Sequence, residues 1–210
     1  MDQSYWNDYY SKDLVPQQPS NFALFCFDEF RDHLLNIFDL GCGNGRDSFF
    51  FSKNSLNAIG IDQSEKAIKE NIIKSQQSSL PCKFINDDFS VFDYDAFCTS
   101  SLYSLYSRFT LHSINYKDEE ILFNKIYNLR NLDVVFIEAR TINDNLYGQG
   151  SKLGLHEFFT DHYRRFIDPE ILRSKLEKKF DILYFEERTG FSKNDYEDPC
   201  LVRVVAKLKR

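Results

Sequence analysis

The sequence has little glycine, proline or methionine, and it has no long apolar run. Only 8 of its 210 residues are glycine, 5 are proline and 1 is methionine. No apolar run approaches the roughly 20 residues of a membrane span, which excludes an integral membrane protein. The first eight residues have neither a basic start nor an apolar stretch, so we expect no signal peptide and a cytoplasmic location.

Positive charge is also in deficit. The net charge is −6, which argues against a nucleic-acid partner because such binding needs a basic face to neutralise phosphates. The five cysteines are widely spaced without a Cys-x-x-Cys pair, and this predicts reduced thiols. The four histidines include no His-x-x-x-His pair, so we expect no bound metal.

Apolar and polar patterning predicts strands that alternate with helices. The expected strands span 36–40, 56–61, 82–86, 100–107 and 133–138, and the expected helices span 20–35, 46–53, 64–76 and 117–129, with another from 168. This alternation predicts one α/β domain over 1–210 with a mostly parallel sheet. Two final strands, 180–188 and 201–208, have no helix between them, which favours antiparallel pairing. The last strand alternates in polarity, which predicts one less buried face.

A glycine-rich loop follows the first expected strand. Gly41, Gly43 and Gly45 alternate with other residues there, and the lack of side chains lets a ligand approach the backbone at the sheet edge. The dinucleotide fingerprint Gly-x-Gly-x-x-Gly would need a small residue at position 46. Arg46 occupies that position, which disfavours a nicotinamide oxidoreductase.

With Asp39 two residues before the first glycine, this loop resembles the first motif of class I S-adenosylmethionine-dependent methyltransferases of the bacterial small-molecule type. The resemblance covers about 20–139 and 168–210. It implies a Rossmann-like seven-stranded sheet, mostly parallel with an antiparallel last strand, and helices on both faces. It also implies S-adenosyl-L-methionine as the cofactor.

The resemblance implies further cofactor contacts. Asp62, at the end of the second strand, would accept the ribose hydroxyls. After the third strand, Asp88 would lie near the adenine amine, with Asp87 as the alternative, and Phe89 against the ring. Segment 1–35 would form a lid and helix over the cofactor, or an apolar edge packed on the core. Its Tyr9 or Tyr10 hydroxyl, and Arg46, are candidate partners of the cofactor carboxylate; Arg46 could equally be solvated.

The segment after the fourth strand, 107–112, restricts the methyl acceptor. It lacks the Asp/Asn-Pro-Pro-aromatic motif of amide and adenine methylation, the Pro-Cys pair of cytosine methylation and the acids of metal-dependent catechol enzymes. It ends in His112, a candidate general base for a hydroxyl acceptor. A structural role for this histidine is the alternative.

An insert over 141–167 separates the fifth strand from the next helix and is longer than a usual connection. We expect it to cover the substrate site. Arginine forks bind carboxylate and phosphate, so a group of residues here predicts an anionic substrate: Arg140, His162, Tyr163, Arg164 and Arg165. The alternative is a solvated charged face. We expect one of the two adjacent arginines to face the pocket and the other the solvent.

These features predict methyl transfer to a small, anionic oxygen acceptor, phosphorylated or similar to a sugar nucleotide, in surface polysaccharide biosynthesis. Two alternatives stay open. The loop Gly-Asn-Gly-Arg-Asp also resembles bacterial tellurite- and thiopurine-type enzymes, which would mean a detoxifying thiol or metalloid methyltransferase. A catalytically idle cofactor-binding module is the other.

Overall fold

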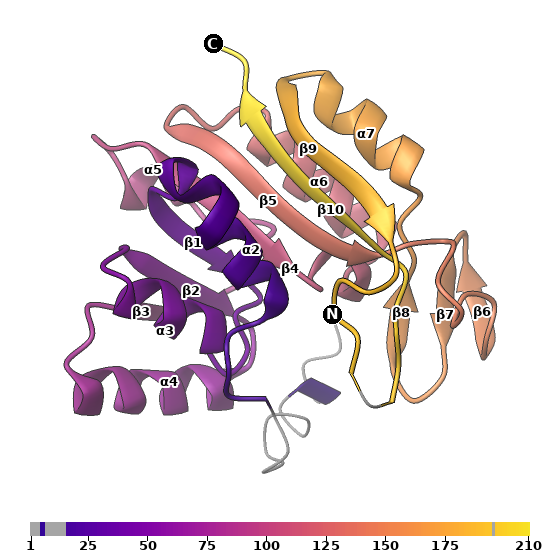
Figure 1. Cartoon of the computed structure of the whole chain (residues 1–210), viewed down its shortest axis with the longest axis horizontal. Coiled ribbons are helices and arrows are strands. Elements are labelled where there is room, and N and C mark those ends of the chain that lie inside the picture. The colour runs from indigo at the N-terminus through magenta and orange to yellow at the C-terminus, as the bar shows by residue number, and fades with distance from the viewer. Residues whose placement is uncertain (1–4, 7–15, 195) are drawn as a thin grey trace.

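The computed structural model describes residues 5–6, 16–194 and 196–210, and its centre is a seven-stranded sheet (Figure 1). The strand order is β3-β2-β1-β4-β5-β10-β9. The first five strands in this order are parallel, whereas β10 runs antiparallel to both β5 and β9. The strands are β1 (Asn36–Leu40), β2 (Ala58–Asp62), β3 (Lys83–Asn86), β4 (Tyr103–Arg108), β5 (Leu132–Arg140), β9 (Phe180–Arg188) and β10 (Leu201–Leu208). This arrangement confirms the predicted fold class.

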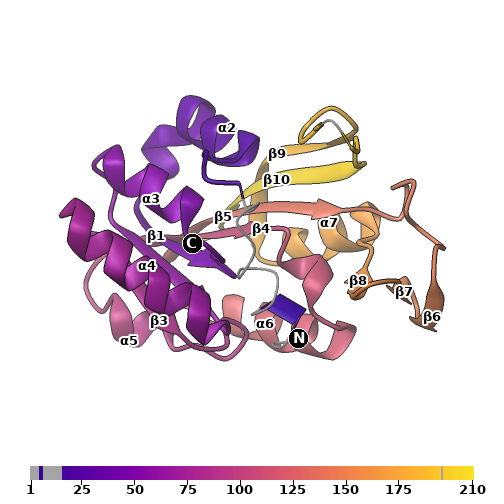
Figure 2. The same cartoon turned by 90° about the horizontal axis from the view of Figure 1, so that it is seen from below.

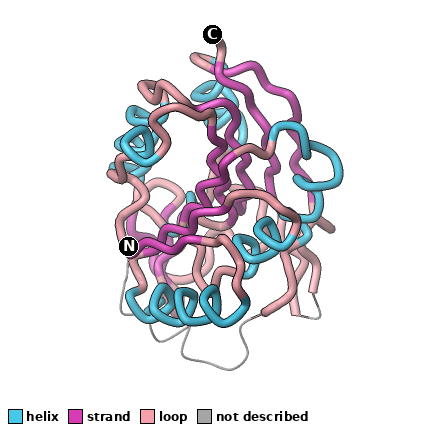
Figure 3. The backbone as a smooth tube through the Cα atoms, turned by 90° about the vertical axis from the view of Figure 1, so that its left-hand side faces the viewer, coloured by secondary structure: helices cyan, strands magenta, loops and turns pink. Residues whose placement is uncertain are grey.

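Helices cover both faces of the sheet (Figures 2 and 3). One face carries α2 (Asn21–Phe30), α3 (Arg46–Lys53) and α4 (Glu65–Ser78), and the other carries α5 (Tyr94–Phe97), α6 (Tyr116–Ile126) and α7 (Pro169–Glu177). Short 3-10 turns, η1 (Arg31–His33) and η2 (Leu111–Ser113), follow α2 and β4. Side-chain caps start several helices, because Ser20, Ser64 and Asp168 each accept a backbone N–H from the first turn.

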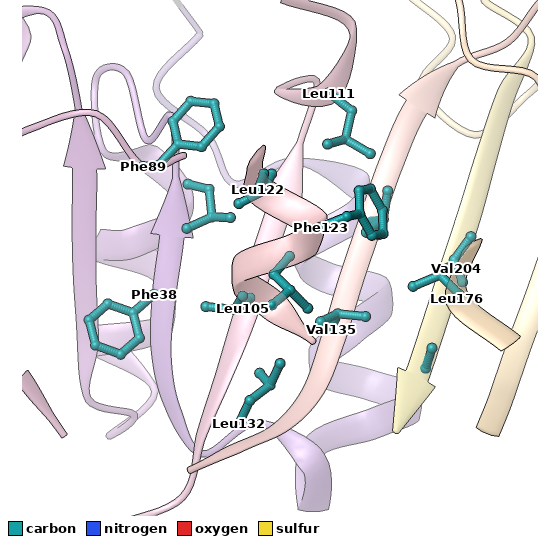
Figure 4. Packing of buried hydrophobic residues seen from close by; sticks show 14 of the residues in the cluster. Phe38, Phe89, Leu105, Leu111, Leu122, Phe123, Leu132, Val135, Leu176 and Val204 are labelled. Carbon is teal, nitrogen blue, oxygen red and sulfur yellow. The ribbon is translucent and has the colours of Figure 1, made fainter. Parts of the chain in front are cut away.

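The core consists of two apolar layers, one on each side of the sheet. One layer contains Phe38, Leu105, Leu122 and Leu176, which pack between the strands and the α6–α7 side (Figure 4). The other layer contains residues of α2, α3 and α4 packed against the opposite strand faces. The central strands are therefore buried on both faces, as parallel sheets covered by helices require.

Strand β10 corrects one expectation. Its alternating sequence predicted a less buried face, but the residues from Leu201 to Ala206 are all buried between β5 and β9. The buried charged residue of this strand, Arg203, has its charge paired inside the sheet. Its Nε donates to Glu138 Oε2 at 2.7 Å and its Nη2 donates to the Phe191 carbonyl at 3.1 Å. A paired charge of this kind is tolerated in the interior.

The segment between β5 and α7 forms a small sheet of its own. Its antiparallel strands are β6 (Ser151–Gly154), β7 (Glu157–Phe159) and β8 (Tyr163–Arg165). The two ends of the segment meet, because Ile142 N donates to the Ile167 carbonyl and Ile167 N donates to the Arg140 carbonyl. This small sheet stands beside the edge at which the parallel strands end (Figure 1).

Candidate active site

A cavity of about 540 Å³ lies at the carboxyl ends of the central parallel strands. It is lined from the ends of β1, β2, β4 and β5, from the N-terminal segment, from the β6–β8 insert and from the β9–β10 connection. The neighbouring strands β1 and β4 lie at the point where the strand order reverses. Ligands of open α/β sheets bind at this point.

The glycine loop after β1 has the conformation that its sequence requires. Gly41, Gly43 and Gly45 have φ angles of +65°, +53° and +74°, a region that side chains other than glycine rarely adopt. A Cβ on Gly45 would lie 2.9 Å from Phe84 Cε1, and one on Gly41 would lie 3.0 Å from Thr110 Cγ2. The loop therefore needs glycine both for its backbone angles and for its close packing.

Three carboxylates, those of Asp39, Asp47 and Asp62, lie around this loop. Asp62 binds the loop directly, because its Oδ2 accepts from Gly43 N at 2.9 Å and its Oδ1 accepts from Ser64 N at 2.7 Å. Asp39 accepts from Ser48 Oγ at 2.6 Å. Burial, and then the nearby Asp47 charge, raise the pKa of Asp39 to about 7, and burial also raises the pKa of Asp62. All three acids line the cavity, which makes this end suitable for a cationic ligand.

Asp47 is a site residue that the sequence reasoning missed. Its carboxylate accepts from both the backbone N and the Oγ of Ser20, each at 2.7 Å, and from the Tyr106 hydroxyl at 2.8 Å. It thereby joins the start of α2 to β4 and α3. In the sequence Asp47 looks like an ordinary acid in the first turn of a helix, so only its distant partners reveal the role.

The N-terminal segment lies over the glycine loop. Asn44 Nδ2 donates to the Pro16 carbonyl at 2.8 Å, and Arg46 Nη1 lies 3.5 Å from the Gln18 carbonyl. Tyr5 and Trp6 line the cavity, and the Tyr5 ring stacks on His162 of the insert with centroids 4.5 Å apart. Tyr9 and Tyr10, which the sequence singled out, lie outside the described residues.

Cationic side chains gather on the β4, β5 and insert side of the cavity. Arg108 lies 3.1 Å from Glu138, and Arg140 contacts Asp144 at 3.0 Å and Glu197 at 2.5 Å. Arg164 lies 3.8 Å from Asp161. Burial, and then the Arg140 charge, lower the pKa of Arg164. Arg140 and Arg164 both line this end of the cavity.

One aromatic residue, which sequence reasoning also missed, contacts two of these cations. Phe109 follows β4 with a φ of +58°, a strained angle for this residue type. The Arg108 guanidinium carbon lies 4.1 Å from its ring centroid and the Arg140 carbon 5.8 Å. Strain of this kind is common at functional sites, and the positive φ could not be predicted from an aromatic residue in the sequence.

His112, on η2, lies in the cavity wall as a neutral imidazole. Burial, and then the charges of Arg140 and Arg164, hold its pKa well below the ordinary value. Its Nδ1 faces the Arg140 backbone N at 3.5 Å, which assigns the ring proton to Nε2. In this tautomer His112 can donate a hydrogen bond, but it is a weak base.

Six of the predicted site residues that the structure describes do not line the cavity, and two of them, Gly43 and Gly45, belong to the glycine loop itself. Asp88 accepts from Ser90, and Phe89 is buried in the apolar layer of Figure 4. The Tyr163 hydroxyl faces the Ile114 carbonyl at 3.5 Å. We expected one of the two adjacent arginines to face the pocket and the other the solvent. Arg164 lines the cavity, but the solvent part is wrong, because Arg165 is buried against α6, where Glu119 pairs with it.

The described part of the chain holds no group of three or more His, Cys, Asp and Glu residues placed to bind a metal. Within the same residues, no helix is long and apolar enough to cross a membrane. All five cysteines are free thiols, as their spacing predicted.

Comparison with known proteins identifies the family. A methyltransferase domain model matches residues 31–143, more than half of the chain, and the chain belongs to this family. A curated relative, a carboxy-S-adenosyl-L-methionine synthase from Nautilia profundicola, is 25% identical over 162 residues. The match covers 70% of this chain and 66% of that protein, so the chain spans just under two thirds of the relative's length.

Solved structures show the same fold at low identity. The PH0226 protein of Pyrococcus horikoshii superposes with a TM-score of 0.71 at 13% identity, covering 96% of this chain and 99% of the other. TehB of Haemophilus influenzae superposes with a TM-score of 0.68 at 15% identity, covering 97% of this chain and 67% of the other. A didemethyltoxoflavin N1-methyltransferase of Burkholderia thailandensis, with bound S-adenosylhomocysteine, gives 0.72 at 13% identity, covering 99% and 87%. The chain is a class I methyltransferase domain, and S-adenosylmethionine is its cofactor.

Proposed function

We propose that this methyltransferase transfers the methyl group of S-adenosylmethionine to an anionic oxygen of a small acceptor. The division of charge along the cavity carries the proposal. Asp39, Asp47 and Asp62 line it beside β1 and β2, whereas arginines line it beside β4, β5 and the insert. The first end suits the sulfonium and ammonium groups of the cofactor, and the second suits an anion.

The proposed cofactor contacts follow the glycine loop. The loop backbone lets the cofactor approach the sheet edge, and Asp62 keeps lone pairs for the ribose hydroxyls beside its bonds to Gly43 and Ser64. Arg46, on the cavity wall, is proposed to meet the cofactor carboxylate. Asp39 is proposed to stabilise the cationic part of the cofactor.

Methyl transfer is an in-line displacement. A lone pair of the acceptor oxygen attacks the methyl carbon, and the carbon–sulfur bond breaks with its electron pair going to sulfur. The protein mainly has to align the three atoms and exclude water. An acceptor oxygen that is already negative needs no proton removed, which agrees with a buried His112 whose lowered pKa makes it a weak base.

We assign His112 the role of hydrogen-bond donor to the acceptor, in place of the general base that its sequence position suggested. Arg140 and Arg164, which both line this end of the cavity, would orient the anionic group. Phosphorylated and sugar-nucleotide-like acceptors, such as those of surface polysaccharide biosynthesis, fit this charge requirement. The cavity volume leaves room only for a small acceptor beside the cofactor.

Product analysis tests the proposal. The protein is incubated with S-adenosylmethionine and a panel of carboxylates, phosphomonoesters, sugar nucleotides, hydroxyl compounds, thiols and metalloid oxyanions, and products are read by mass spectrometry. We expect an anionic oxygen compound to gain one CH₂ mass. A methylated thiol or metalloid would instead support the detoxifying alternative, and cofactor binding without any product would support an idle module.

The curated relative adds one further outcome. Its name describes a cofactor that carries an added carboxyl group. Such a product would appear as a gain of CO₂ mass on the cofactor, with no gain on an acceptor.

Replacing Arg164 by Gln should weaken the binding of the acceptor and leave the binding of the cofactor unchanged. We expect the acceptor KM to rise by a factor equivalent to about 1.5–3 kcal/mol, the range for hydrogen bonds to charged groups. The Kd of S-adenosylhomocysteine, measured by calorimetry, should stay as in the parent. Arg173→Gln on α7, whose guanidinium is partly exposed beside Glu177, is the matched control. An unchanged KM with every accepted substrate would refute the anionic subsite.

Replacing His112 by Ala distinguishes the two kinds of oxygen acceptor. A loss of a hydrogen-bond donor should lower kcat/KM modestly, and the loss should be the same at each pH. A hydroxyl acceptor would need a base, so a loss of about 100-fold or more with a changed pH profile would assign that role to His112 instead.

A further inference from the structure

Arg164 and Arg165 are successive residues of β8 and therefore point to opposite faces of that strand. Arg164 lines the cavity. Arg165 does not line the cavity, and its side chain is buried, with only 6% of the residue exposed. Its side chain points towards η2 and α6, and its contacts there indicate a role for this buried arginine behind the acceptor end of the site.

Arg165 holds the turn that carries His112. Its Nε donates to the Ile114 carbonyl at 3.0 Å and its Nη2 donates to the Leu111 carbonyl at 3.0 Å. These two carbonyls belong to residues on either side of His112. Because the guanidinium is planar and rigid, the two bonds fix the turn in one orientation relative to β8.

The charge of Arg165 is balanced by an acid that is shared with a second cation. Glu119, in the first turn of α6, is buried and pairs with Arg165 Nη2 and with Lys175 Nζ of α7. Lys175 also lies 2.5 Å from Glu120. Both cations thus pair with the carboxylate of Glu119. Of the two, Arg165 is the one that also donates hydrogen bonds to the Leu111 and Ile114 carbonyls.

We infer that Arg165 is a positioning residue of the active site, which fixes the His112 turn against β8 so that His112 and Arg164 face the same acceptor. The inference rests on the proposed function only for the role of that end of the cavity. Arg165 does not line the cavity, so its effect must pass through the geometry of the turn. Loss of Arg165 should loosen the turn. Thr110, at the start of the turn, keeps its own bond to the Leu40 carbonyl at 2.7 Å, so we expect the glycine loop that it contacts to stay as it is.

The shared carboxylate supplies a matched control for the experiment. Arg165→Met and Lys175→Met each remove one cation from Glu119, but only the first removes the bonds to Leu111 and Ile114. The full-length variants are compared by hydrogen exchange of the amides in 109–116, by NMR titration of the His112 ring and by calorimetry with S-adenosylhomocysteine. None of these readouts needs an acceptor, so they can fail or succeed independently of the methyl-transfer assay.

We expect Arg165→Met to speed exchange in 109–116 by about tenfold or more relative to Lys175→Met. The His112 ring, which faces Arg108, Arg140, Arg164 and His162, should titrate closer to its ordinary range in Arg165→Met because the loosened turn admits water. The Kd of S-adenosylhomocysteine should match the parent in both variants. Equal exchange in the two methionine variants would overturn the inference, since Arg165 would then act only as one half of an ion pair.

Arg165→Lys keeps the inference testable if Arg165→Met does not fold. Lysine retains the charge beside Glu119, but it lacks the rigid fork that spans the two carbonyls. We expect a melting temperature near that of the parent together with faster exchange in 109–116. Parental exchange and parental His112 titration in this variant would show that charge alone suffices, and the positioning role would be wrong.

Discussion

Asp39 carries a carboxyl group whose pKa is held at about 7 by burial and by the neighbouring Asp47 charge. A carboxyl with this pKa is only half ionised near neutral pH. The cofactor is cationic at its sulfonium and ammonium groups, and a cation favours the ionised form of a neighbouring acid. Proton release from Asp39 is therefore coupled to cofactor binding.

The coupling predicts that the affinity for S-adenosylmethionine rises by about tenfold between pH 6 and pH 8, as expected for one group with a pKa of about 7. Asp39→Asn should bind more weakly at pH 8 and show little pH dependence. Calorimetry at a series of pH values measures this. Asp28→Asn, an exposed position on α2, changes the same charge and should keep the parental profile.

The same carboxyl affects the stability of the cofactor-free protein in the opposite direction from an ordinary surface acid. Its folded pKa is raised from 3.8, so its contribution favours folding at low pH and is lost as the pH rises through about 7. Asp39→Asn should therefore gain stability relative to the parent as the pH increases from 5 to 8, on the order of a few kcal/mol. Chemical denaturation at each pH checks the sign, and a constant difference would contradict the raised pKa.

At the scale of single elements, the glycine loop combines an unusual backbone with close packing. Gly45 has a φ of +74° and is the N-cap of α3, and an added Cβ there would lie 2.9 Å from Phe84 Cε1 and 3.0 Å from Asn71 Nδ2. A replacement there must accept both the left-handed angle and the contact. Gly148, in the connection after β5, has a φ of +84° and nothing within 4 Å of an added Cβ.

These two glycines separate conformational cost from packing cost. Gly148→Ala should lose about 1–2 kcal/mol of stability, the cost of the left-handed angle. Gly45→Ala should lose that amount and roughly 1–3 kcal/mol more, because overpacking adds to it. Thermal or denaturant unfolding measures both. Equal losses would mean that Phe84 and Asn71 move aside without cost.

On the scale of the whole molecule, the cavity is lined by parts of the chain that are far apart in sequence. Tyr5 and Trp6 approach His162 of the insert, with the Trp6 and His162 ring centroids 6.0 Å apart. Tyr5 and Trp6 of the N-terminal segment and His162 of the insert thus line the same cavity. Trp6 is the single tryptophan of the chain, so tryptophan fluorescence reports on the surroundings of this one side chain.

Titration with S-adenosylhomocysteine should change the Trp6 emission, because the indole lines the cavity that the ligand enters. His162→Leu should alter the emission before any ligand is added, and Trp6→Phe should remove the signal. The measurement is a fluorescence titration with excitation selective for tryptophan. Binding seen by calorimetry without any change in emission would show that the N-terminal segment does not meet the bound ligand.

The sequence by itself determined the order of the elements, the parallel sheet and the glycine loop. These depend on local signals, namely the period of apolar residues, the caps Ser20, Ser64 and Asp168, and glycines at positions that need a positive φ. The position of the ligand site then follows from the parallel sheet, because parallel strands bring their carboxyl ends to one edge. This rule places His112 at the ligand edge, and the resemblance to class I methyltransferases added Asp39 and Asp62; all three line the cavity.

Tertiary structure alone decided which charged side chains face the cavity and which are paired within the protein. Arg164 and Arg165 are adjacent and chemically identical, yet the pairing of β8 sends one to the cavity and the other to Glu119, which lies 46 residues earlier in the chain. Asp47 likewise acquires its role from Ser20 and Tyr106. The burial of β10 depends on its position between two neighbours. Such roles depend on partners distant in sequence, and a local pattern carries no information about them.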